Sequence, residues 1–210
     1  MFNKIKEFFT HKDKYLRDNR WIFASMLVGA IISLMAAFIL SIEAIDIAKN
    51  PNVFLSCNIN SIINCGIVAK TSFAALFGFP NSFIGMISEP VVITVAIAGL
   101  SGVHFPRLFM FTAQIFYTLG FIFAYYLFFI GLFVVGAVCP WCLLVTLSTT
   151  FVFFSMTRYN IREENLFLPK KLADRARNYI EKDYDKLILA TIVVAVIAML
   201  IIKYGNGLFA

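Results

Sequence analysis

Residues 139–156 read CPWCLLVTLSTTFVFFSM, and this stretch decides both the class of the protein and its chemistry. It begins with two cysteines separated by a proline and a tryptophan, and it continues as a run without a charged residue. The run approaches the roughly 20 residues that a helix needs to cross a bilayer at about 1.5 Å rise per residue. The stretch therefore predicts a membrane-spanning helix that carries a CxxC pair in its first turn.

The composition extends this prediction to the whole chain. Hydrophobic residues make up 60% of the 210 residues, charged residues only 14%, and the mean hydropathy is +0.84, far from the values of soluble domains. Because the first 20 residues are polar and the apolar run after them is too long for a signal-peptide core, we expect the first span to stay as an anchor. The predicted spans are Trp21 to Ile42, Pro80 to Leu100, Leu108 to Ile130, Cys139 to Met156 and a shorter fifth, Leu187 to Ile202.

The distribution of basic residues predicts the orientation of these spans. With a cytoplasmic N-terminus, every Lys and Arg except Lys49, Lys70 and Lys203 falls in a cytoplasmic segment, as the positive-inside rule requires. This distribution accounts for the net charge of +6 without a nucleic-acid ligand. It also puts all four cysteines on the extracytoplasmic side, where disulfides persist.

The predicted fold is an all-α integral membrane protein built around a four-helix bundle. Within the outer loop, residues 66–77 predict a short apolar helix ended by Gly78. This helix either covers the mouth of the bundle or rests on lipid, and the sequence favours neither. The predicted segments are a basic cytoplasmic N-terminus at 1–20, the bundle at 21–156 with its outer loop at 43–79, a cytoplasmic amphipathic segment at 157–186, and a fifth transmembrane helix with a short outer tail at 187–210.

The two cysteine pairs suggest thiol and disulfide chemistry. Pro140 suits the first helical position because it has no N–H to leave unpaired, which makes Cys139 the predicted N-cap. The helix dipole favours a thiolate near this end by about 0.3 to 1 kcal/mol, so Cys139 can be both a reactive thiol and a good leaving group. Cys57 and Cys65 can form either a structural or a redox-active disulfide. A zinc site of four thiolates is a third reading, but the loop pair lacks the close spacing of zinc ligands.

Electrons that reach a membrane dithiol need an acceptor. The sequence has no haem or flavin signature, and His11 and His104 both fall on the predicted cytoplasmic side. A quinone, which reaches its site from within the bilayer, fits best.

Glu89, followed by Pro90, lies about 14 Å into its span at 1.5 Å per residue. It either bonds a carbonyl that the proline frees or delivers protons to the quinone.

Three motifs in order, C57NINSIINC65, G78FPNS82 and C139PWC142, resemble the vitamin K epoxide reductase family. The resemblance covers roughly residues 21–156 and implies a four-helix bundle around a quinone, closed by a loop and a half-helix. The fifth span lies outside this region and looks like an addition seen in some bacterial members. The resemblance thus implies a quinone-linked, disulfide-forming bacterial member without a fused thioredoxin domain.

The resemblance also implies a role for each cysteine. Cys57 would exchange with a partner thiol, Cys65 would attack Cys139, and Cys142 would donate electrons to the quinone. Bacterial members of this kind reoxidise a separate thioredoxin-fold protein of the DsbA type outside the plasma (inner) membrane. The family often has an acidic residue directly after the first loop cysteine, where this chain has Asn58.

Three polar residues match positions near the family's quinone. Asn81 matches an Asn that hydrogen-bonds a quinone carbonyl. Thr71 occupies, approximately, a hydroxyl position beneath the half-helix that supports the bundle mouth or the quinone pocket. Thr146 stands where some members have a Tyr that donates a hydrogen bond to the quinone, and its hydroxyl has a shorter reach.

The leading interpretation is a membrane oxidoreductase that passes electrons from a thiol protein through two cysteine pairs to menaquinone or ubiquinone. A different class, a non-enzymatic membrane scaffold whose outer loop is pinned by structural disulfides, would also use cysteines on one face. Metal transport through a thiolate site is a third. The redox state of the cysteines and their response to quinone distinguish these functions.

Overall fold

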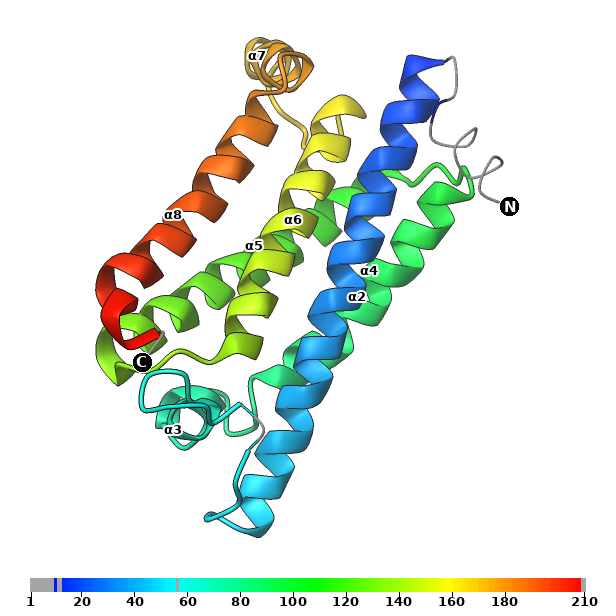
Figure 1. Ribbon diagram of the computed structural model, residues 1–210. Coiled ribbons are helices and arrows are strands. Elements are labelled where there is room, and N and C mark those ends of the chain that lie inside the picture. The colour runs from blue at the N-terminus through cyan, green and yellow to red at the C-terminus, as the bar shows by residue number, and fades with distance from the viewer. Residues whose placement is uncertain (1–9, 11–12, 56, 209–210) are drawn as a thin grey trace.

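The computed structural model describes residues 10, 13–55 and 57–208, and all the regular elements within these ranges are helical (Figure 1). Five helices are long and apolar enough to cross a membrane: α2, α4, α5 with its extension η2, α6 and α8. This confirms the predicted all-α membrane fold with a fifth span. The elements are α2 (Lys14–Lys49), α3 (Cys65–Ala69), the 3-10 helix η1 (Ser72–Ala75), α4 (Ser82–Leu100), α5 (Arg107–Phe129), the π-helix η2 (Ile130–Val135), α6 (Pro140–Arg162), α7 (Lys170–Glu181) and α8 (Tyr184–Leu208).

Helix α2 is longer than the span predicted for it. It has 36 residues and runs on to Lys49, so the outer loop predicted at 43–79 begins only at Asn50. Helix formers such as Glu43 and Ala44 continue the helix past its apolar part. It ends at Asn50, which is extended at φ −141°, because the following Pro51 disfavours helical geometry in the residue before it.

The single short helix predicted at residues 66–77 is wrong, because the structure has two, α3 and η1. Thr71 interrupts them with an extended backbone at ψ 153°, and its hydroxyl donates to the Val68 carbonyl at 2.7 Å. The second of these helices ends at Ala75, before the predicted end at Gly78; Gly78 itself has φ +82°, a conformation that favours glycine, and lies in the turn that follows. We call residues 65–78 the cap.

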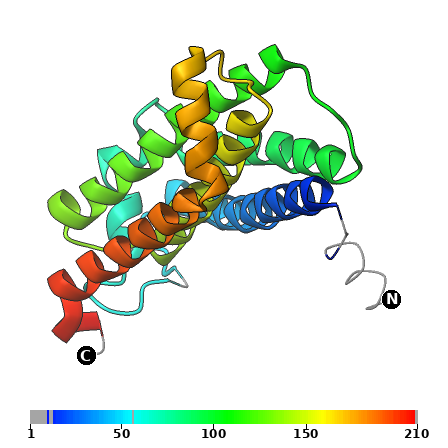
Figure 2. The ribbon, with the colours of Figure 1, turned by 90° about the horizontal axis from the view of Figure 1, so that it is seen from above.

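Helix α2 is the central element of the bundle. It packs along both α4 and α6, and α5 packs on the far side of α6. Helices α4 and α5 follow each other in the chain but make few contacts, and Figure 2 shows α5 running at a steep angle to α2 and α4. Phe23 of α2 is fully buried against Tyr159 of α6, with ring centroids 4.8 Å apart. The bundle is thus tight around α2 and open between α4 and α5.

Ion pairs attach α8 at the end of the molecule where α7 lies, opposite α3 (Figure 1). Arg158 of α6 binds Asp185 at 2.7 Å and Asp183 at 2.9 Å. The pKa of Asp183 is lowered, first by its hydrogen bond to Lys186 and, against the opposing effect of desolvation, also by Arg158. At the other end of α8, Lys203 and Tyr204 donate hydrogen bonds to the Leu132 carbonyl of η2.

Close packing of α2 against α4 makes a prediction about Gly99. A methyl group at Gly99 would overlap the ring of the fully buried Phe23. We expect Gly99→Ala to destabilise the protein by about 1–3 kcal/mol, the usual cost of overpacking a core. Thermal unfolding of the detergent-solubilised protein measures this as a lower midpoint.

Gly120→Ala is the matched control, because a methyl group at this helical glycine meets no atom within 4 Å. It should leave the midpoint unchanged or raise it slightly, since alanine favours a helix over glycine by roughly 1 kcal/mol. Equal midpoints for the two variants would contradict the packing described for α2 and α4.

Candidate functional site

The four cysteines gather at the end of the bundle where α3 lies, which we call the cysteine end. Cys57, Cys65 and Cys139 are buried and belong to one contact cluster, against which the half-buried Cys142 also packs. They come from three places in the chain: the loop after α2, the start of α3 and the start of α6. The structure therefore brings together all four cysteines that the sequence singled out.

Backbone hydrogen bonds hold the two cysteine segments side by side. The Asn64 N–H donates to the Val138 carbonyl at 3.1 Å, and the Val138 N–H donates to the Ile62 carbonyl at 2.7 Å. Ile63 and Val138 form an isolated parallel bridge. Because Asn64 precedes Cys65 and Val138 precedes Cys139, the pairing places these two cysteines at adjacent positions.

The two pairs differ in redox state. Cys57 and Cys65 form a disulfide with an S–S distance of 1.99 Å, whereas Cys139 and Cys142 are free thiols. Asn58 connects the two disulfide segments, because its side-chain oxygen accepts the Gly66 N–H at 3.0 Å. Asn58, which stands directly after the first loop cysteine where an acidic residue is common in the family that this chain resembles, thus has a structural role beside the disulfide.

The CxxC pair begins its helix as the sequence predicted. Cys139 is the N-cap of α6, Pro140 occupies the first turn, and the Cys142 N–H points at the Cys139 sulfur at 3.3 Å. The Cys139 sulfur therefore lies at the N-terminus of α6, the positive end of the helix dipole. Cys139 is therefore suited to leave during disulfide exchange.

Glu43 is a site residue that the sequence interpretation missed. It lies on the extension of α2, is 7% exposed, and its two carboxylate oxygens lie 3.4 and 3.6 Å from the Cys57 sulfur. The sequence placed it in the outer loop, whereas α2 continues past its apolar run and carries Glu43 to the cysteines. Donor atoms of Glu43, Cys57 and Cys65 lie within 4.8 Å of one another, as metal ligands would. The two sulfurs are bonded to each other, however, and metal sites use thiolates.

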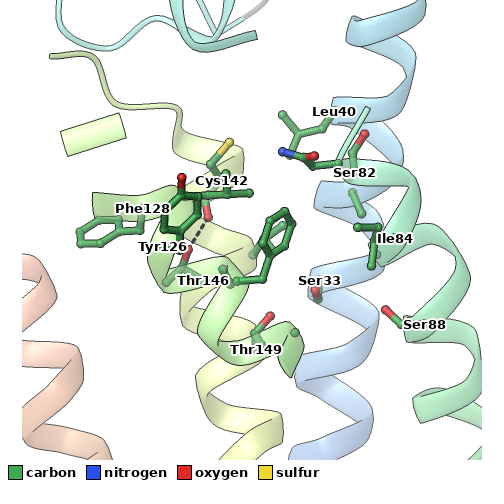
Figure 3. A pocket seen from close by; sticks show the side chains of 18 of the residues that line it. Ser33, Leu40, Ser82, Ile84, Ser88, Tyr126, Phe128, Cys142, Thr146 and Thr149 are labelled. Carbon is green, nitrogen blue, oxygen red and sulfur yellow. Dashed lines mark hydrogen bonds between the residues drawn. The ribbon is translucent and has the colours of Figure 1, made fainter. Parts of the chain in front are cut away.

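A cavity of about 1210 Å³ lies inside the bundle, bounded by α2, α4, α5 and α6 with the cap over one end. Figure 3 shows its wall: Ser33 and Leu40 come from α2, Ser82, Ile84 and Ser88 from α4, Tyr126 and Phe128 from α5, and Cys142, Thr146 and Thr149 from α6. The wall is mostly apolar, with scattered oxygens. Its volume and lining fit a flat apolar ring with two carbonyl oxygens, as in a quinone. Helices α4 and α5, which make few contacts with each other, both contribute residues to this wall.

The three polar residues predicted for the quinone all line this cavity. The Asn81 amide donates to the Phe73 carbonyl at 2.7 Å and accepts the Leu76 N–H at 3.1 Å, which leaves one amide hydrogen for a ligand. Thr71 and Thr146 each give their single hydroxyl hydrogen to a backbone carbonyl, that of Val68 and that of Cys142 respectively. Asn81 is thus the one of the three with a donor to spare.

Glu89 is buried deeper in the same cavity wall. One carboxylate oxygen accepts hydrogen bonds from Ser33 at 3.0 Å and Tyr117 at 3.4 Å. The other is buried with no partner among the described residues, and it bonds no carbonyl near Pro90. Its surroundings allow either a structural link between α2, α4 and α5 or a proton store facing the cavity.

Comparison with known proteins connects this site to a family. The sequence profile described as "Vitamin K epoxide reductase family" matches residues 24–157. The match includes both cysteine pairs, the cap and the start of α4, and it ends before α7 and α8. No curated protein matches the chain.

The hydrogen bonds of Asn81 predict how the cap depends on this residue. We expect Asn81→Ala to loosen η1, because it removes two hydrogen bonds of about 1 kcal/mol each. Hydrogen–deuterium exchange of a peptide covering residues 72–78 should be at least tenfold faster than in the unchanged protein. Asn52→Ala, an exposed position outside the cap, should leave it as it was. Equal exchange in Asn81→Ala and the unchanged protein would refute the contacts.

Proposed function

Since the chain belongs to the vitamin K epoxide reductase family, whose members are membrane disulfide oxidoreductases, we propose that it carries electrons from a thiol protein to a quinone. The observation that carries the proposal is the meeting of a disulfide and a dithiol at the wall of one apolar cavity. The product is an oxidised thiol protein, and the activity supports disulfide formation outside the cytoplasm.

The first step loads electrons onto the loop pair. A thiolate of the reduced partner attacks the Cys57 sulfur, the Cys57–Cys65 bond breaks, and Cys65 leaves as a thiolate. The second partner thiol then attacks its own mixed disulfide and frees Cys57. The partner has lost two electrons, which Cys57 and Cys65 now hold as a dithiol. Because Cys57 is only 5% exposed, the loop at 51–64 must open to admit the partner.

The second step passes the electrons to the CxxC pair in its disulfide form. The Cys65 thiolate attacks Cys139, the Cys139–Cys142 bond breaks, and Cys142 leaves as a thiolate. Cys57 then attacks Cys65, which re-forms the loop disulfide and releases Cys139. The adjacency of Asn64 and Val138 supports this transfer, as does the position of Cys139 at the helix N-terminus. The structure, with its oxidised loop pair and free CxxC thiols, matches the state after this step.

The last step discharges the CxxC pair toward the cavity. A bound quinone supplies an acceptor for two electrons and two protons. Cys139 and Cys142, released as thiolates, give up the two electrons and close their disulfide, with Cys142 on the cavity wall. The two protons that the acceptor takes up balance the two that the partner thiols released. Asn81 has one amide hydrogen with which to orient an acceptor carbonyl, while Thr71 and Thr146 shape the wall. The apolar lining excludes water, and it suits menaquinone and ubiquinone alike.

The partner we propose is a separate thioredoxin-fold protein of the DsbA type. Such a protein is a strong oxidant, near −120 mV, so its reoxidation needs an acceptor of comparable or higher potential. A quinone pool kept oxidised by respiration provides one. The scaffold interpretation is less suited to this site, because a structural staple does not need the two free thiols beside it.

Replacement of each cysteine tests the proposed electron path. We expect Ala at Cys57, Cys65, Cys139 or Cys142 to lower quinone reduction at least 100-fold, because each variant lacks a sulfur that must form a bond. The assay follows quinone absorbance with a reduced thioredoxin-fold protein as donor. Ser101→Ala, at the other end of α4, is the control and should keep full activity. Full activity in Cys142→Ala would refute the path.

We also propose that the cysteine end faces the outside of a bacterial inner membrane, with the N-terminus in the cytoplasm. The basic segments around α7 support this orientation through the positive-inside rule. In a background with the native cysteines replaced by Ala, a membrane-impermeant maleimide should label Asn52→Cys in intact cells. Arg175→Cys on α7 should react only after the membrane is opened. The reverse pattern would overturn the orientation.

A further inference from the structure

Glu43 is an acidic side chain buried where it contacts a reacting sulfur. It is 7% exposed, and both carboxylate oxygens lie within 3.6 Å of the Cys57 sulfur. Burying a carboxyl is costly unless its surroundings compensate for lost water. Cys57 is bonded to Cys65 in this structure, so the contact becomes a thiol hydrogen bond only when the disulfide is reduced. The Glu43 carboxylate is therefore positioned to accept a hydrogen bond from Cys57 in the reduced state, when Cys57 carries a proton.

Cys57 must change its protonation twice in each cycle of the proposed path. It leaves the partner as a thiolate and takes up a proton, and it must lose that proton before it attacks Cys65. At 5% exposure it has little water to exchange with. A general acid or base has to lie within hydrogen-bond reach of the proton that it moves, and Glu43 meets this requirement.

We propose that Glu43 is the catalytic acid and base of Cys57. This inference rests on the proposed function and adds a residue to it. Glu43 gives a proton to the Cys57 thiolate when the partner departs, and becomes a carboxylate. In the transfer to the CxxC pair, the carboxylate takes the proton back as the Cys57 sulfur attacks Cys65 of the Cys65–Cys139 mixed disulfide. Cys139 leaves with the electron pair of the broken bond, and Glu43 is again protonated for the next cycle.

Charged and titratable groups near this contact come from the loop, α3, α6 and α2 itself. The loop and α3 contribute Cys57 and Cys65, and α6 contributes Cys139 and Cys142. On α2 itself the neighbours along the chain are Asp46 and Lys49. Asp46 is one turn beyond Glu43 and has the same charge, which makes Asp46→Asn the matched control for Glu43→Gln.

The test follows the mixed disulfide that Glu43 resolves. Full-length protein in lipid nanodiscs turns over with reduced glutathione as donor and a fully substituted benzoquinone, to whose ring thiols do not add, as acceptor. Samples are quenched with acid and alkylated, and mass spectrometry measures the Cys65–Cys139 crosslink. Glu43→Gln should turn over at least tenfold more slowly and accumulate the crosslink, as Cys57→Ala does. Asp46→Asn should match the unchanged protein.

The pH dependence separates a catalytic role from a structural one. Without the Glu43 carboxylate, the Cys57 thiol ionises only as solvent pH rises, so the crosslink in Glu43→Gln should be abundant at pH 6 and decline toward pH 9. A crosslink level that does not change with pH in this variant would indicate a structural role and overturn the proposal. So would wild-type turnover in Glu43→Gln.

Two further outcomes are decisive. If Glu43→Gln does not fold, Glu43→Asp takes its place: it withdraws the carboxyl by one methylene and should slow turnover at least threefold with partial accumulation of the crosslink. Turnover and crosslink at wild-type levels in Glu43→Asp would then overturn the proposal. Absence of quinone reduction by the unchanged protein would instead refute the whole electron path, and with it the role of Glu43.

Discussion

Two backbone hydrogen bonds, between residues 62–64 and Val138, are the constraint on which the site depends. The segment before Cys65 and the segment before Cys139 are both irregular, and irregular backbone at the edge of a bilayer must find partners for its polar groups. Here each satisfies the other. The pairing that satisfies the backbone also aligns Cys65 with Cys139, so exchange between the pairs requires no long-range movement.

The position of the cavity follows from unequal helix packing. Helix α2 presents small or closely fitting side chains to α4 and α6, as with Gly29, which lies against Val152 of α6. Membrane helices associate through such close contacts, since lipid provides no hydrophobic drive. Helix α5 buries only Met110, Gln114 and Tyr117, and it makes few contacts with α4. The bundle therefore closes around α2 and leaves a space between α4 and α5, with Cys142 on its wall.

Local rules predicted much of this structure. The start of α6 needed only Pro140 after a capping residue, and the five spans needed only their apolar length. Predictions from the sequence were wrong where the structure depends on contacts between different elements. Hydropathy marks where a helix leaves the lipid and not where it ends, so α2 was predicted too short and Glu43 was assigned to a loop. The break at Thr71 depends on Asn81 holding η1 from the start of α4, a tertiary contact that no local pattern contains.

Because the cysteines are buried, the proposed electron path has little water with which to exchange protons. Transfer from the loop pair to the CxxC pair exchanges one disulfide for another, so it needs no net proton; over the whole cycle the partner thiols release two protons and the acceptor takes up two. One carboxyl beside Cys57 can therefore serve both halves of the cycle by passing the same proton back and forth. Glu89, with an unpartnered oxygen among the described residues of the cavity wall, stands where protons for an acceptor in the cavity would be delivered. Two buried carboxyls at different depths are costly in a membrane bundle, and a path that moves electrons without water is a physical reason to keep both.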